Sequence, residues 1–185
     1  MTTGTTTLAQ LAGDYVMDVA HTRLGFVARH AMVTKVRGSF DDFDGKFHID
    51  ADPGKSTVTV TIKAASITTR NEQRDAHLKS NDFLAMEEYP EITFESTDIE
   101  IVDDATVKVA GELTIRGTSK PVSFELEFTG SATDPFGNFR VGFEGSLVIN
   151  RKDWGVNWNA ALEAGGVLVS EKVTLEFDVS AIRQG

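Results

Sequence analysis

From residue 56 onward, apolar and polar residues alternate at period two, and this pattern leaves few folds open to the chain. In "TVTVTIKA" (57–64), one face carries Val58, Val60, Ile62 and Ala64. Such alternation is typical of β-strands that bury one face and expose the other. Four later runs repeat it, with in-phase apolar residues at Val107, Val109, Leu113 and Ile115; at Val122, Phe124, Leu126 and Phe128; at Phe139, Val141, Phe143, Leu147 and Ile149; and at Val173, Leu175, Phe177 and Val179.

Short turn-forming sequences separate these runs and predict antiparallel neighbours, because Pro, Gly, Asp and Asn favour tight turns. They are "DPG" (52–54), "RGTSKP" (116–121) and "DPFGN" (134–138). Two further strands are expected upstream, at 23–30 and 36–49. Within the second, the apolar phase slips by one residue at Asp41 and Asp42, which predicts a bulge or a sharp bend.

These runs amount to about eight strands, and the longer ones would span about 30 Å at roughly 3.3 Å per residue. Antiparallel strands with one apolar face can close as a two-sheet sandwich or as a barrel, and a barrel leaves no edge to protect. We therefore expect an all-β fold, an extended antiparallel eight-stranded barrel that side chains could fill or that could hold one slender ligand. We also expect a single domain over 13–183, a flexible N-terminal segment over 1–12, and one or two short helices at about 70–88.

Composition excludes several classes of partner and site. The net charge of −10 disfavours nucleic acid. The chain has no cysteine, which excludes disulfides, thiolate metal sites and a cysteine nucleophile. Its N-terminus shows no signal-peptide pattern, and no run of about 18 apolar residues occurs. We therefore expect a cytoplasmic protein without an integral membrane segment.

Glycines fall on the apolar face of the expected strands at Gly38, Gly45, Gly111 and Gly145. Glycine weakens a strand unless it permits bending or leaves space for another group. These glycines could provide the curvature of a barrel or open a tunnel inside it, and the two roles are compatible.

Polar residues continue two of the apolar faces, His30 after 24–28 and Arg151 after 143–149. A buried charge needs compensation, so Arg151 is expected in an ion pair, at an open rim or against a ligand. Asp153 is close enough in sequence to be the carboxylate. For His30, the alternatives are a structural role and a contact with a ligand head group.

The densest polar cluster, "RNEQRDAHLKSNDF" (70–83), predicts a short helix capped by Asn71. Arg74 and His77 share a face of that helix, and Asp75 could orient His77 for acid/base chemistry. However, no nucleophile or known catalytic motif accompanies them, and the histidines have no metal-ligand spacing. A polar helix covering one mouth of the barrel and an acid/base site both remain open.

Five segments carry a family resemblance and follow one another along nearly the whole chain: "DVAHTRLGFVARH" (18–30), "VRGSFDDFDGKFHID" (36–50), "SITTRNEQRDAHLKSNDFLAMEEYPEITFEST" (66–97), "GELTIRGTSKPV" (111–122) and "INRKDWGV" (149–156). With them the sequence resembles the YceI-like family of lipocalin-like, polyisoprenoid-binding barrels. The resemblance implies a barrel whose apolar tunnel binds a long lipid, with no established catalytic residues and no required metal. The chain departs from the family pattern at Tyr15, where tryptophan is common, at Thr22, where serine is usual, and in lacking the frequent export signal.

The function expected from the sequence is binding, sequestration or transport of a long-chain amphiphilic lipid of isoprenoid or fatty-acyl type. The lipid is the expected partner, a homodimer is possible, and no cofactor, metal or catalytic residue is expected. Polar head-group contacts would come from His30, Arg74, His77 and Arg151. The apolar tunnel would be lined by Phe26, Phe40, Phe43, Val60, Ile62, Phe94, Leu113, Leu126, Phe143 and Leu147.

Two other classes of function stay open at this stage. The first is an enzyme acting on such a lipid, with His77 or His30 as the acid/base. The second is a barrel with a packed core that serves as a protein-interaction scaffold, which an exposed apolar patch at Trp154 and Trp158 would favour.

Overall fold

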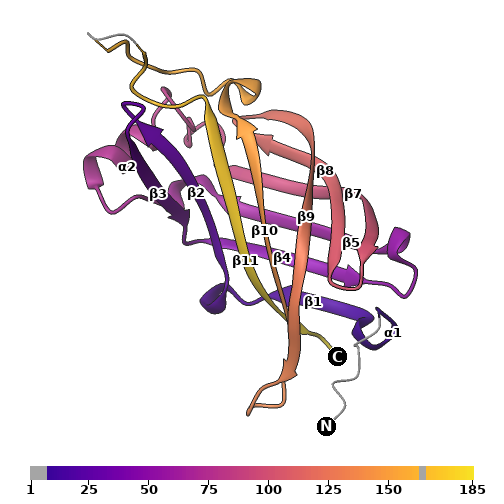
Figure 1. Cartoon of the computed structure of the whole chain (residues 1–185). Coiled ribbons are helices and arrows are strands. Elements are labelled where there is room, and N and C mark those ends of the chain that lie inside the picture. Colours follow the sequence, from indigo (N-terminus) through magenta and orange to yellow (C-terminus); the bar gives the residue numbers. More distant parts are fainter. Residues whose placement is uncertain (1–7, 163–165) are drawn as a thin grey trace.

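Within residues 8–162 and 166–185, which the computed structural model describes, eight strands close into an antiparallel barrel, as the sequence predicts (Figure 1). The ring closes because β11 pairs with β1 as well as with β10. In ring order the strands are β1 (Gly13–Met17), β4 (Phe43–Ile49), β5 (Thr57–Lys63), β7 (Glu91–Asp103), β8 (Thr106–Ile115), β9 (Thr118–Thr133), β10 (Phe139–Asn150) and β11 (Lys172–Arg183).

Three further strands extend one end of the barrel: β2 (Arg23–His30), β3 (Thr34–Phe40) and β6 (Ile67–Thr68). The same edge of β11 pairs with β2 through 174–178 and with β1 through 181–183. β3 continues the extension by pairing with β2 and β6. The strand predicted at 23–30 therefore lies in this extension, whereas the ring uses β1, which the alternation pattern did not predict.

The strand predicted over 36–49 is divided into β3 and β4 by a bend at Asp41 and Asp42, where the phase slip predicted a bulge or bend. Backbone hydrogen bonds hold the bend: the Asp41 amide donates to the Ser66 carbonyl (3.2 Å), and the Lys63 amide donates to the Asp42 carbonyl (2.9 Å). As a result, β3 pairs within the extension while β4 pairs with β1 and β5 in the ring.

Helical segments are short and lie in the connections. The α-helices are α1 (Leu8–Leu11) and α2 (Glu72–Lys79), and the 3-10 turns are η1 (Val19–His21), η2 (Pro53–Lys55), η3 (Ala64–Ser66) and η4 (Arg151–Trp154). Helix α2 begins after Asn71, whose side chain accepts a hydrogen bond from the Arg74 amide (3.0 Å), which is the predicted cap. Among the described residues, no helix is long and apolar enough to cross a membrane.

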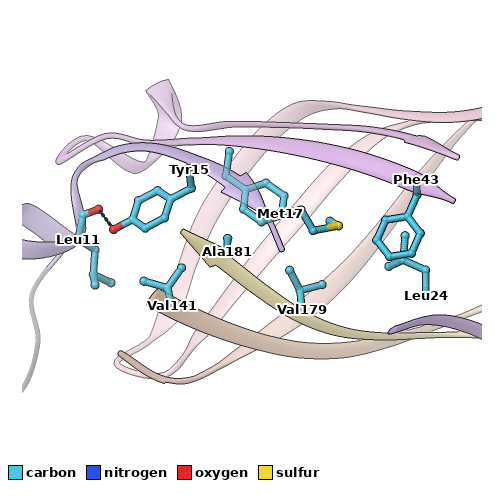
Figure 2. Close-up of a cluster of buried hydrophobic side chains, with 9 residues drawn as sticks. Leu11, Tyr15, Met17, Leu24, Phe43, Val141, Val179 and Ala181 are labelled. Carbon is cyan, nitrogen blue, oxygen red and sulfur yellow. Dashed lines mark hydrogen bonds between the residues drawn. The ribbon is translucent and has the colours of Figure 1, made fainter. Parts of the chain in front are cut away.

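The expected flexible segment over 1–12 differs from the structure at its C-terminal part. Residues 8–11 form α1, and Leu11 is buried in the barrel core. The Tyr15 hydroxyl donates to the Leu11 carbonyl (2.7 Å), which ties α1 to β1 (Figure 2). The remaining part of the predicted segment, residues 1–7, lies outside the described residues.

Two clusters of buried side chains stabilise the barrel. The first lies where β1 and β4 face β10 and β11 (Figure 2) and contains Leu11, Tyr15, Met17, Leu24, Phe43, Phe47, Val141, Val179 and Ala181. The second lies toward the end where η3 and η4 leave the barrel and contains Ala64, Ile92, Leu113, Ile149 and Trp154. Burial of this apolar surface is the main favourable term in folding.

Candidate binding cavity

An apolar cavity of about 320 Å³ lies inside the barrel near α1, η2 and the β7–β8 turn. A volume of roughly 300 to 1,000 Å³ is typical of small-molecule sites. Its walls come from seven strands of the ring, so barrel closure is what creates it. The lining residues are Leu11, Phe47, His48, Ile49, Pro53, Ser56, Thr57, Val58, Ile99, Ile101, Asp103, Asp104, Ala105, Thr106, Val107, Val109, Leu126, Phe128, Phe143 and Val179.

Inward-facing side chains beside the cavity are only half-buried. On β9, Leu126 and Phe128 are half-buried, whereas their outward neighbours are exposed. In a filled interior such residues would be fully buried, as Val141 on β10 is, with 1% of its surface exposed. Leu126 and Phe128 both line the cavity. The interior is therefore hollow along β9.

Aromatic rings border the cavity from several strands. Phe128 and Phe143, opposite one another in the β9–β10 register, have ring centroids 5.5 Å apart. Deeper in the barrel, Phe124 contacts Phe94 of β7 at 5.5 Å and Phe177 of β11 at 5.1 Å. The rings of Phe94, Phe124 and Phe177 thus form a row that joins non-adjacent strands, next to the residues that line the cavity.

The rim of the cavity is acidic. Among the described lining residues, Asp103, Asp104 and His48 are ionisable, and none is Lys or Arg. The pKa of Asp103 is lowered chiefly by a hydrogen bond from the Ala105 amide (2.9 Å), so its carboxylate stays charged. Negative charge at the rim disfavours an anionic head group.

His48 does not cancel the negative charge of the cavity rim. Its two ring nitrogens lie 2.7 Å from an Asp14 carboxylate oxygen and 3.3 Å from an Asp50 carboxylate oxygen. The hydrogen bond to Asp14, followed by that to Asp50, raises the pKa of His48. When His48 is protonated, its positive charge faces two carboxylates of the protein itself.

Two of the residues predicted to line a tunnel, Leu126 and Phe143, line this cavity. Of the others, Phe26, Phe43 and Leu113 are buried. The rest are partly buried and pack in or against the two core clusters or their neighbours: Phe40, Val60, Ile62, Phe94 and Leu147. Contact of these eight side chains with a ligand stays a prediction.

The space left by the inward glycines is taken by neighbouring side chains. A Cβ atom at Gly38 would clash with the Phe26 ring, and one at Gly145 would clash with Leu126 and with the backbone of β9. Met17 lies over Gly45 and Phe94 over Gly111 in the same way. These glycines therefore admit large inward side chains instead of widening the cavity directly.

Arg151 is buried, as its phase predicts, but its partners are backbone carbonyls. Its guanidinium donates to the carbonyls of Val156 (2.7 Å), Ser170 (2.8 Å) and Val169 (3.2 Å). The expected ion pair with Asp153 is wrong, since Asp153 is exposed and forms no bond with it. Burial lowers the pKa of Arg151, and the charge of Glu171 opposes this. Arg151 thus fastens the chain after η4 and lies outside the cavity lining.

The polar groups around α2 form hydrogen bonds with one another. The Arg74 guanidinium donates to the hydroxyl (2.7 Å) and carbonyl (2.8 Å) of Thr69. Asp75 accepts from the Thr69 amide (2.8 Å) and hydroxyl (2.6 Å), so it does not orient His77. The acid/base interpretation is therefore wrong about the partner of His77.

His77 instead pairs with Asp82, at 2.8 Å between Nε2 and a carboxylate oxygen. Its ring packs edge-on against Phe83 at 5.0 Å and against Trp158 at 4.6 Å. These contacts fit a role in anchoring the connection after α2, and His77 does not line the cavity.

The remaining candidates lie elsewhere in the extension and in η4. His30 is exposed at the end of β2, where it bridges to Val169. Trp154 is buried, and its indole N–H donates to the Leu113 carbonyl (2.8 Å). Trp154 therefore does not form the exposed apolar patch that would favour the scaffold interpretation.

Sequence reasoning omitted several residues that line the cavity. Val107, Val109, Phe128 and Val179 have the inward phase, but that phase alone does not indicate a cavity. His48, Asp103 and Leu11 carry no local signal, because the chain segments that hold them meet only when the ring closes. Among the described residues, no cluster of three or more His, Asp or Glu could hold a metal ion.

A family model described as a YceI-like domain matches residues 15–181. The chain belongs to the YceI-like family. Related proteins agree: a UPF0312 protein of Staphylococcus aureus strain N315 is 41% identical over 170 residues, covering 91% of this chain and 95% of the relative. A UPF0312 protein of Ectopseudomonas mendocina is 36% identical over 177 residues, covering 94% and 90%.

Solved structures share the YceI-like fold. The Campylobacter jejuni YceI protein matches with a TM-score of 0.73 at 30% identity, over 85% of this chain and 90% of that one. BcnA of Burkholderia cenocepacia matches with a TM-score of 0.78 at 22% identity, over 89% and 98%. A Saccharophagus degradans domain described as polyisoprenoid-binding has a TM-score of 0.71 at 15% identity, over 92% and 98%. At these identities the last two show likeness of fold.

Proposed function

We propose that this protein binds a long-chain amphiphilic lipid inside the barrel and holds it for sequestration or transport. The observation that carries the proposal is the apolar cavity of about 320 Å³ behind half-buried inward residues of β9 and β10. Each methylene buried there would contribute about 0.8 kcal/mol, so a hydrocarbon chain can bind without many polar contacts.

The lipid we favour has an isoprenoid or fatty-acyl chain and a head group without negative charge. The polyisoprenoid-binding description of the Saccharophagus degradans domain makes an isoprenoid the first candidate. The charge argument comes from the rim, where Asp103 and Asp104 line the cavity and His48 is shared between two carboxylates. An alcohol, amide or quinone head group could accept or donate hydrogen bonds there without like-charge repulsion.

The direct test is extraction of the purified protein with organic solvent, followed by mass spectrometry and by binding of polyprenol and fatty-amide probes. We expect a recurring long-chain species or saturable probe binding, with weaker binding of the corresponding phosphate or carboxylate. A protein that is repeatedly empty and binds neither probe would contradict the proposal.

A variant of one cavity residue locates the ligand. Phe143→Trp adds volume at the cavity wall, so we expect lower lipid occupancy while the β-type circular dichroism is kept. Val148→Trp is the matched control, because Val148 lies on the same strand and is 59% exposed. Equal occupancy in both variants would place the lipid outside this cavity.

A further inference from the structure

The tip of the β2–β3 hairpin exposes apolar side chains that lipid binding inside the barrel does not explain. Met32 is 61% exposed and Val33 is 75% exposed. Figure 1 shows this hairpin reaching the end of the molecule away from the β9–β10 hairpin. Contiguous exposed apolar side chains are one mark of a protein or membrane interaction site.

Turn chemistry does not require these residues. The Val33 amide donates to the His30 carbonyl (3.0 Å), and the two residues between them, Ala31 and Met32, have φ angles of 52° and 62°. Turns with two left-handed residues favour Asn and Gly, because a Cβ atom is disfavoured in that region. The hairpin therefore presents a methionine at its tip despite the preference of its backbone for a smaller residue.

Basic residues surround this apolar tip in an otherwise acidic protein. Arg29, Lys35 and Arg37 are exposed, and the segment 29–37 contains no Asp or Glu, although the chain carries a net charge of −10. Within the part of the chain that the structure describes, none of these three cations takes part in an ion pair. The Arg29 guanidinium donates to the Val33 carbonyl (3.3 Å), which keeps its charge at the tip.

We propose that residues 29–37, the hairpin tip, dock on an anionic lipid surface. Met32 and Val33 would insert at the level of the head groups, and the three basic side chains would contact the anionic groups beside them. The overall charge of −10 does not prevent this, because charges more than about 10 Å from the surface are largely screened at moderate salt. Docking would bring the barrel to the lipid that it carries, and this step rests on the proposed function. Docking on the membrane surface does not depend on the proposed function.

Sedimentation of the full chain with vesicles tests the proposal. Vesicles of phosphatidylcholine with about 30% phosphatidylglycerol should retain the protein at low salt, and pure phosphatidylcholine vesicles or high salt should release it. We expect Lys35→Gln with Arg37→Gln to weaken the binding roughly thirty-fold, from the usual contribution of a basic residue near an anionic surface. Met32→Ser with Val33→Ser should weaken it while keeping the salt dependence.

Phe136→Ser is the matched control, since Phe136 is 87% exposed at the tip of the β9–β10 hairpin. It should bind vesicles as the unaltered protein does. Docking is overturned if the unaltered protein ignores anionic vesicles, or if the Met32 and Val33 variant binds as well as the Phe136 variant. Lipid extraction separates the two proposals: a hairpin variant that still contains lipid but no longer sediments with vesicles loses docking alone.

Discussion

At the scale of single residues, Arg151 shows how a buried charge can be stabilised without a carboxylate in contact. Three carbonyl oxygens from two segments, at Val156 and at 169–170, accept hydrogen bonds from its guanidinium. The alternation phase that continues from β10 correctly predicts burial of Arg151, but the ion pair expected from proximity in sequence is wrong. Every residue has a backbone carbonyl, so the sequence does not indicate which carbonyls will accept hydrogen bonds from Arg151.

Removing the guanidinium should therefore destabilise the fold strongly. Arg151→Met keeps much of the side-chain volume but leaves three carbonyls without their donor, so we expect a loss of about 2–4 kcal/mol in the free energy of unfolding. Urea denaturation monitored by tryptophan fluorescence measures it. Lys152→Gln, which breaks only the exposed ion pair with Glu171, should cost less than about 1 kcal/mol. Similar losses in both variants would contradict the buried role of Arg151.

Among the predicted tunnel residues, Phe143 and Leu113 lie in different environments although both face inward. Phe143 borders the cavity, whereas Leu113 is 7% exposed and its carbonyl accepts the indole N–H of Trp154. The period-two pattern distinguishes inward from outward faces, but it cannot distinguish a filled layer from a hollow one. That difference depends on which side chains of opposite strands meet, and it appears only when the ring closes.

At the scale of elements, the β9–β10 hairpin is held by a carboxylate at its turn. Asp134 accepts hydrogen bonds from the amides of Phe136 (2.8 Å) and Asn138 (3.0 Å) and from the Arg140 guanidinium (2.7 Å). Desolvation alone would raise the pKa of Asp134, but the hydrogen bonds, above all that from Arg140, lower it from 3.8 to about 2. Arg140 also pairs with Asp18, which links the hairpin to the start of η1.

The lowered pKa predicts how the hairpin depends on pH. A carboxyl group whose pKa is lower in the folded state stabilises that state above its unfolded value of 3.8, and the contribution disappears as pH falls through about 2. Asp134→Asn should therefore be less stable than the unaltered protein at neutral pH, with the difference shrinking between about pH 4 and pH 2. Urea denaturation across this range measures it, and a difference independent of pH would argue against the ionised carboxylate.

Individual strands were the most predictable elements. The long runs of β5, β8, β9, β10 and β11 have one apolar face each, and the structure places strands there. β1 was missed because it is only five residues long, with two buried side chains, Tyr15 and Met17. Two inward residues are too few to show a period, although they belong to the largest buried cluster. Pairing and packing on β4 and β11 stabilise this segment as a strand.

At the scale of the whole molecule, eight strands were expected and eight close the ring, but the two sets differ. The expected set counts 23–30 and lacks 13–17, whereas the ring contains β1 and leaves β2 in the extension. Alternation along a strand gives its faces but does not say which strands are neighbours. The position of the cavity rim depends on which strands are neighbours, so the alternation pattern does not predict it.

The closing seam of the barrel should be its least stable ladder. β1 meets β11 through three residue pairs, Tyr15 with Arg183, Val16 with Ile182 and Met17 with Ala181, whereas β10 meets β11 through eleven. Fewer cooperative hydrogen bonds make local opening easier, so the backbone amides of β1 should exchange with solvent deuterium faster than those of central β10 and β11. Bound lipid should slow this exchange, because contacts along the interior favour the closed ring. Hydrogen exchange followed by mass spectrometry compares the strands in one experiment. Protection of β1 equal to that of β10, with or without lipid, would contradict this prediction. It would mean that packing of Tyr15, Met17 and Ala181 makes the short β1–β11 ladder as stable as the long β10–β11 ladder.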